Sequence, residues 1–140
     1  MAQTISDPVL SSLARALLGG VSYAGPATLY VAFFTGASVP LTGGTEASGN
    51  NYSRTPVANN TTNFPSATGS GGTITVANGT PIVSPRSTGS WGSAINCVRL
   101  YDNSGNVLAG AMLSPTRNVD AAGITITIEA GAATFALAST

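Results

Sequence analysis

The five carboxylates of this chain are the side chains best suited to acid–base chemistry. Two carboxylates brought together by a fold can hydrolyse a glycosidic bond, one as the acid and the other as base or nucleophile. Each carboxylate here lies in a different segment, at a position typical of a helix cap, a loop, a hairpin turn, a turn or a sheet surface. In that order they are Asp7, Glu46, Asp102, Asp120 and Glu129. A polysaccharide-cleaving enzyme is therefore a hypothesis that ranks below a structural protein and below a binding module.

Other residues that catalysis uses are scarce. The chain has no histidine and no lysine, since all five of its basic residues are arginines. Ser-His-Asp, Cys-His and Ser-Lys arrangements are thereby excluded. The single cysteine, Cys97, cannot form an internal disulfide or a zinc site, and we expect a buried free thiol in a protein made in a reducing cytoplasm. The sequence predicts that this protein is not an enzyme and binds no cofactor or metal.

A glycine-rich stretch, Gly69-Ser70-Gly71-Gly72, resembles a phosphate-binding loop in its glycines alone. Such a loop ends in Lys and Ser or Thr and leads into a helix. Strand-like residues follow here instead, so we interpret the stretch as a flexible turn.

Charged residues make up 7% of the chain, and the formal net charge is zero. A typical globular protein is about one quarter charged, so the polar surface here must consist of Ser, Thr, Asn and backbone. Burying such a surface costs less than burying charges, which need partners. The composition therefore predicts a structural protein whose surface is covered in an assembly. Scattered arginines argue against nucleic-acid binding, and the absence of a long apolar run argues against a membrane protein.

One helix is expected near the N-terminus, over residues 8 to 18. Asp7 can cap it, Pro8 fits its first turn, and the Gly19-Gly20 pair ends it. It presents one apolar stripe to a sheet or to a partner. That stripe consists of Leu10, Leu13 and Leu17.

A buried strand is expected at Leu29–Phe34, a continuous apolar run with strong strand propensity. Residues 35–72 consist mostly of Gly, Ser, Thr, Asn and Pro, and predict a long loop with one short strand near Tyr52–Val57. Loops of this length are usually functional or ordered by a neighbour. We interpret this loop as an arm that contacts other subunits.

The second half of the chain predicts strands separated by turn residues. They are expected at Thr73–Val76, Pro81–Val83, Ser93–Tyr101, Val107–Leu113, Ile124–Glu129 and Ala133–Ala138. Asp102–Asn106 predicts a hairpin turn, and the alternation in Ile124–Glu129 places its three isoleucines on a covered face. We therefore predict one mainly β domain over residues 1–140, a β-sandwich or open barrel of about seven strands with one N-terminal α-helix within residues 1–20 and a long irregular loop over residues 35–72.

Candidate residues for an assembly interface come from the helix and from two isolated side chains. An arginine fork suits carboxylates and carbonyls of a neighbouring subunit. A tryptophan placed like Trp91 most often covers the edge of a core, and it can alternatively anchor an interface. The predicted interface consists of Leu10, Leu13, Leu17, Arg54 and Trp91. We predict no catalytic, cofactor-binding or metal-binding residue.

Several motifs follow one another in an order that resembles a known family. The chain is similar, over most of its length, to small virion proteins of tailed bacteriophages that are often labelled phage tail fibre proteins. The specific motifs are Leu-Tyr-Val-Ala-Phe-Phe-Thr at 29–35 and Gly-Asn-Asn-Tyr-Ser-Arg at 49–54. Weaker ones are Leu17–Gly20, Trp91–Ser93, the turn at 102–106, Ala122–Ile126 and Ala130–Ala132.

The resemblance implies a β-rich, non-enzymatic virion protein made in the host cytoplasm. We favour a capsid decoration (cement) protein, a homotrimer over junctions of the major capsid protein that opposes the pressure of packaged DNA. The helix and the long loop would contact the capsid or sister copies. The capsid is favoured over the tail because a chain without heptads or a collagen-like period has no fibrous shaft. The alternative is a tail or tail-fibre component that binds a host receptor or glycan.

Overall fold

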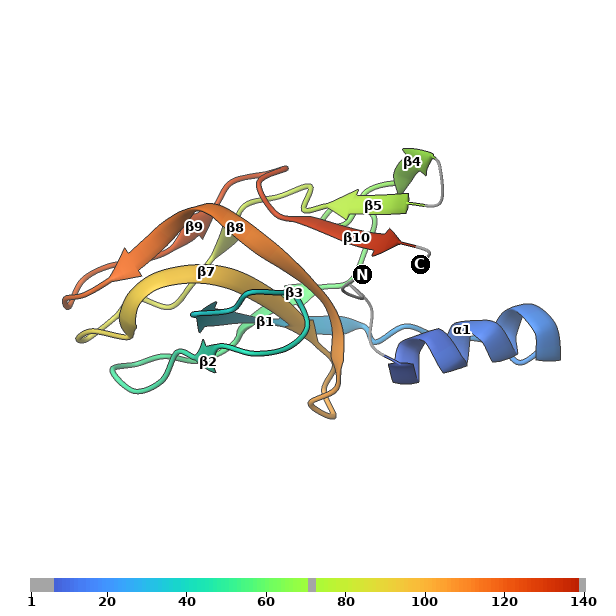
Figure 1. The fold of residues 1–140 in the computed structure, drawn as a ribbon, viewed down its shortest axis with the longest axis horizontal. Coiled ribbons are helices and arrows are strands. Elements are labelled where there is room, and N and C mark those ends of the chain that lie inside the picture. The colour runs from blue at the N-terminus through green and yellow to red at the C-terminus, as the bar shows by residue number, and fades with distance from the viewer. Residues whose placement is uncertain (1–6, 71–72, 139–140) are drawn as a thin grey trace.

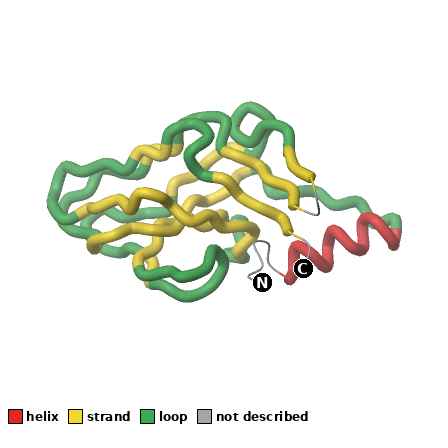
Figure 2. The backbone as a smooth tube through the Cα atoms, turned by 45° about the horizontal axis from the view of Figure 1, so that its top comes forward, coloured by secondary structure: helices red, strands yellow, loops and turns green. Residues whose placement is uncertain are grey.

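Antiparallel β-structure dominates the computed structural model, which describes residues 7–70 and 73–138. Within these residues the chain forms one helix and ten strands in three sheets. The helix α1 (Asp7–Gly19) extends away from the β body (Figures 1 and 2). The predicted mainly β, sandwich-like fold with one N-terminal helix is confirmed. Two short strands, β2 (Thr45–Glu46) and β4 (Thr68–Ser70), were not expected from the sequence.

The largest sheet has the order β2-β1-β7-β8, and β3 pairs with the same edge of β1 as β2 does. Because β1 lies between β7 and these two short strands, its backbone is paired on both sides, as the predicted buried strand requires. β8 is six residues longer than expected from the sequence. The strands are β1 (Thr28–Thr35), β2 (Thr45–Glu46), β3 (Thr55–Ala58), β7 (Gly92–Tyr101) and β8 (Val107–Val119).

Two smaller sheets complete the body. One has the order β10-β5-β4 and the other pairs β6 with β9. A single apolar core contains side chains from all three sheets, including Phe33, Ile95, Ile128 and Phe135. The strands are β4 (Thr68–Ser70), β5 (Thr73–Ala77), β6 (Ile82–Val83), β9 (Thr127–Ile128) and β10 (Thr134–Ala138).

Both faces of β1 are buried, which explains its continuous apolar sequence. Val31 and Phe33 belong to the main core, whereas Ala32 and Phe34 belong to a second cluster on the other face of the sheet. The loop of residues 36–44 covers this second cluster. Its backbone is held by Arg99, whose side chain donates to the carbonyls of Pro40 and Gly43 at 2.7 and 2.6 Å.

The predicted strand Ile124–Glu129 is wrong in extent, because only Thr127–Ile128 forms a strand, β9. Upstream of it, the hydroxyls of Ser84 and Ser87 accept hydrogen bonds from the backbone N–H groups of Ile126 and Ile124. These hydroxyl groups replace acceptors that the backbone of a paired strand would otherwise supply. The predicted alternation holds, since Ile126 and Ile128 are buried and Ile124 is half-buried.

Residues 35–72 are largely irregular, as predicted, but the segment also contains β2, β3 and β4. The short strand expected near Tyr52–Val57 is found at Thr55–Ala58. The glycine-rich stretch predicted as a turn begins at the end of β4 with Gly69 and Ser70, and its last two residues lie outside the described residues.

The C-terminal end of α1 and the β7–β8 hairpin follow the sequence signals. The helix ends at Gly19, and Gly20 takes the left-handed φ of 64° that glycine tolerates. Asp7, the predicted cap, is the first helical residue, and its side chain is not among those that the structure describes. The Asp102 carboxylate accepts hydrogen bonds from the backbone N–H groups of Ser104 and Asn106, which confirms the predicted turn. In the described part of the chain, no helix is long and apolar enough to cross a membrane.

Candidate functional site

Helix α1 exposes most of its leucines. Leu17 and Leu18 are 83% and 86% exposed, and Leu10 is 38% exposed. Leu13 is half-buried and is the leucine of this helix that faces the β body. An amphipathic helix normally buries its apolar stripe. In α1, which extends away from the β body (Figure 1), the described residues leave Leu17 and Leu18 uncovered.

An apolar groove of about 360 Å³ lies beside α1, at the end of the β body. In the described residues its lining carries no charged side chain. The side chains that line it are Leu13, Tyr23, Pro26, Leu29, Asn59, Phe64, Val76, Leu100, Leu108, Ala109 and Phe135, together with Gly25.

Strand register brings the groove residues together. The β7–β8 pairing places Leu100 opposite Ala109, and the β10–β5 pairing places Phe135 opposite Val76. The rings of Phe64 and Phe135 meet edge to face, with centroids 6.3 Å apart. The groove is therefore the open end of the main core, where the ends of β1, β7 and β8 face the β10-β5-β4 sheet.

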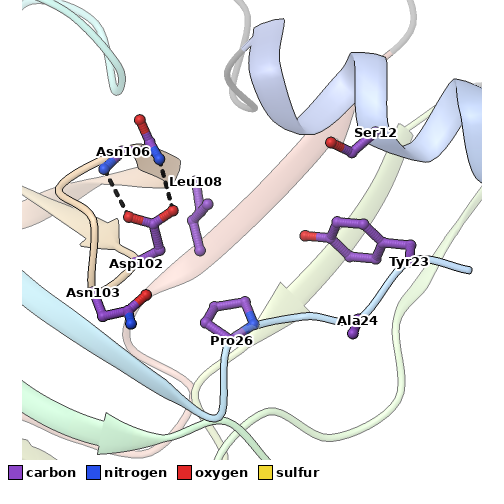
Figure 3. Close-up of a pocket in the computed structure, with 8 residues that line it drawn as sticks. All are labelled: Ser12, Tyr23, Ala24, Pro26, Asp102, Asn103, Asn106 and Leu108. Carbon is purple, nitrogen blue, oxygen red and sulfur yellow. Dashed lines mark hydrogen bonds between the residues drawn. The ribbon is translucent and has the colours of Figure 1, made fainter.

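A polar hollow of about 270 Å³ adjoins the groove, between α1, the residues before β1 and the β7–β8 turn (Figure 3). Asp102, Asn103 and Asn106 line it together with Tyr23. The Asp102 carboxylate serves the turn, because Oδ2 also accepts from the Asn106 amide at 2.8 Å. Those bonds hold the pKa of Asp102 below its usual value, the Asn106 amide having the largest effect.

Arg54, a predicted interface residue, binds side chains of its own chain. Its guanidinium binds both carboxylate oxygens of Glu46, at 2.9 and 2.8 Å, and lies 3.7 Å from the centroid of the Tyr101 ring. The Tyr52 hydroxyl donates to the same carboxylate at 2.9 Å. The Arg54 bonds, with a smaller contribution from Tyr52, hold the pKa of Glu46 below its usual value against the opposing effect of burial.

Trp91, the other isolated candidate, belongs to the core. Its side chain is 5% exposed, its ring packs edge to face on Tyr52, and its indole N–H donates to the Asn50 carbonyl at 2.9 Å. The amide of Asn51 binds the Arg86 carbonyl at 2.9 Å. The Gly-Asn-Asn-Tyr-Ser-Arg motif therefore fastens the long loop to the body.

The predicted interface residues do not form one patch. Leu10, Leu13 and Leu17 share α1, whereas Arg54 and Trp91 make their contacts inside the β body. The sequence did not indicate the groove, because its lining comes from segments far apart in the chain. The available signal was the presence of apolar residues, Leu100, Leu108 and Ala109, on both sides of the predicted turn at 102–106.

Among the residues that the structure describes, no three His, Cys, Asp or Glu side chains are placed to hold a metal ion. Cys97 is a buried free thiol, as predicted, and burial raises its pKa.

Arg99, which the sequence did not single out, is 5% exposed and lies 4.0 Å from the centroid of the Phe34 ring. Its role is to hold the 36–44 loop.

Comparison with known proteins gives the family. The sequence model of one family, described as Podophage GP4 fiber I protein gp80, matches residues 4–136. The chain belongs to this family. Among the curated proteins, none matches the chain. The match confirms the resemblance to phage virion proteins labelled as fibre proteins.

Membership in this family assigns the chain to the structural proteins of the bacteriophage virion. The matched residues include α1 and all of the groove lining. The exposed helix and the groove therefore lie in the portion of the chain that the family shares.

Proposed function

We propose that this protein is a non-enzymatic subunit of a virion fibre, and that α1 joins it to the rest of the assembly. The exposure of Leu17 and Leu18, 83% and 86%, is the observation that carries the proposal. The family description, which names a fibre protein, supports the proposal of a fibre subunit. The partners are sister copies and the virion protein at the base of the fibre.

The energetics favour assembly through α1. Burying a leucine side chain stabilises a complex by roughly 1.5–3 kcal/mol, so that two exposed leucines contribute about 3–6 kcal/mol before the entropy of association is subtracted. An isolated helix of this length is marginally stable in water. A partner on α1 would therefore order the helix as well as bind it.

Capsid decoration is the second candidate, and the charge-poor surface favours it. With 7% charged residues, the β body can lie against a shell of the major capsid protein with little desolvation of charge. In this arrangement a homotrimer would sit over capsid junctions and α1 would contact the shell. The alternative role of a fibre, binding a host receptor or glycan, would use exposed loops of the same body.

Locating the protein on intact virions tests the proposal. Gold-labelled antibody against the β body is expected to mark fibres that project from the particle. Gold spread evenly over the capsid would overturn the fibre assignment and move capsid decoration to first place.

A variant phage tests the role of α1. The substitution Leu17→Asp is expected to abolish incorporation of the protein into particles, measured by immunoblot of purified virions. Ser11→Asp adds a charge to the same helix about one third of a turn away from Leu17. It is the matched control and is expected to leave incorporation intact. Normal incorporation of Leu17→Asp, or of a chain lacking residues 1–18, would contradict the proposed role of α1.

A further inference from the structure

We propose that the apolar groove receives the α1 helix of a second copy of this chain. The inference rests on the proposed function in one respect, that α1 is the assembly element. It adds the partner and the surface that the helix contacts. It is tested on the purified chain, so that its failure and a failure of the fibre assignment can be told apart.

The groove and the helix are each incomplete within one chain. Of the described side chains of α1, only Leu13 lines the groove. Leu10 and Leu17, one turn away on either side, remain 38% and 83% exposed. Leucines at positions i, i+3 and i+7 form one stripe along a helix. A second helix laid in the groove can place all three of these leucines against apolar side chains.

Charge imposes no penalty on this contact. The described groove lining is uncharged, and the leucine stripe carries no charged residue either. Arg15, the charged residue in the middle of α1, lies on the opposite side of the helix from Leu10 and Leu17 and can stay in solvent. Both surfaces are thus matched in polarity, and no ion must be desolvated.

The area is sufficient for a stable complex. A helix of 13 residues is a cylinder about 20 Å long and about 10 Å in diameter, so that the half of its lateral surface that can face a groove is on the order of 300 Å². If each of two copies places its α1 in the groove of the other, the two contacts would bury roughly 1,200 Å², counting the helix surface and the groove surface of both. This area is at the lower limit of a specific interface.

The connection to the body permits the exchange. Residues 20–27 join α1 to β1, and Gly20 adopts a left-handed φ of 64° at the end of the helix. Eight residues can span up to about 27 Å when extended. Each copy supplies one helix and one groove, so that every groove is filled when the copies close into a symmetric dimer or ring.

Solution mass tests the proposal on the full chain. Size-exclusion chromatography with light scattering is expected to show an oligomer for the natural sequence at micromolar concentration, and the monomer mass for Leu17→Asp. Ser11→Asp is the matched control and is expected to remain oligomeric. Circular dichroism verifies that Leu17→Asp keeps its β body. A monomeric natural chain, or an oligomer that survives Leu17→Asp, would overturn the proposal.

Cross-linking identifies the surface. Chains carrying only Leu17→Cys are mixed with chains carrying only Asn59→Cys, whose side chain lines the groove. Oxidation is expected to yield a mixed disulfide between the two chains, because the proposed contact brings the two introduced cysteines together. Cys97 does not compete for this disulfide, since it is buried in both chains. Ser11→Cys with Asn59→Cys is the control pair and is expected to yield little. Equal yields from the two pairs, or none from the first, would exclude the groove as the site.

Discussion

Two arginines lie over aromatic rings of their own chain. Arg54 lies 3.7 Å from the centroid of Tyr101, and Arg99 lies 4.0 Å from that of Phe34. Arg99 binds backbone carbonyls, and Arg54 binds the carboxylate of Glu46. In a chain with ten charged residues, these side chains stabilise loops and leave the outer surface nearly neutral.

Replacing Arg99 tests its part in holding the 36–44 loop. Arg99→Met removes the donor to the carbonyls of half-buried Pro40 and exposed Gly43, and a hydrogen bond from a charged donor contributes about 1.5–3 kcal/mol, less where water replaces it. We expect the free energy of unfolding to fall by about 2–4 kcal/mol in urea denaturation. Arg15→Met, on the exposed helix, is the control and is expected to change it by less than about 0.5 kcal/mol. Equal effects of the two substitutions would contradict this role.

Glu46 predicts a pH dependence of stability. Because the bonds from Arg54 lower its pKa in the folded chain below the usual 4.5, its contribution is present above pH 4.5 and is lost as the pH falls through the folded value. At neutral pH, Glu46→Gln is expected to lower the free energy of unfolding by about 1 kcal/mol. The difference from the natural chain should shrink in strongly acidic solution.

Urea denaturation of both chains at neutral and at acidic pH measures this difference. Glu129→Gln, at an exposed position, is the matched control and is expected to change stability by less than about 0.5 kcal/mol at either pH. A deficit of Glu46→Gln that is the same at both pH values would show that the ion pair does not stabilise the fold.

At the scale of elements, Gly110 allows the 36–44 loop to pack on β8. A Cβ atom at this position would collide with the backbone of Pro40. Gly110→Ala is expected to lower the free energy of unfolding by about 1–3 kcal/mol, because the loop must shift off the sheet. Gly19→Ala, where no atom lies within 4 Å of the added carbon, is the control and should be nearly neutral or stabilising. Thermal unfolding compares the two variants, and equal melting temperatures would contradict the tight loop contact.

The sequence predicted the elements with local signals. The apolar run of β1, the Asp102 turn and the glycine stop of α1 are each encoded by a few adjacent residues, and all three are found. The extent of β9 was not predictable, because the hydroxyls of Ser84 and Ser87 replace the strand ladder from a distant segment.

The candidate site was predictable in part. The leucine stripe of α1 can be read from the spacing of three residues, but its exposure depends on where the body ends. Trp91 and Arg54 contact partners in their own chain that lie 41 and 8 residues away, Asn50 and Glu46. No local pattern distinguishes an arginine or tryptophan that binds its own chain from one that binds a neighbour.

At the scale of the whole molecule, neutrality predicts that assembly responds weakly to salt. Salt screens charge pairs but does not weaken apolar contacts. Sedimentation velocity of the natural chain in low and in high sodium chloride is expected to give the same oligomer fraction. Dissociation in high salt would show that ion pairs hold the copies together and would contradict an apolar helix-in-groove contact.

Cryo-electron microscopy of the intact virion tests the central claim most directly, that this protein is a fibre subunit assembled through α1. The account predicts density for the β body in a projecting fibre, with Leu10 and Leu17 of each α1 enclosed by a neighbouring copy. Bodies lying flat on the capsid shell, with the α1 leucines in solvent, would contradict it.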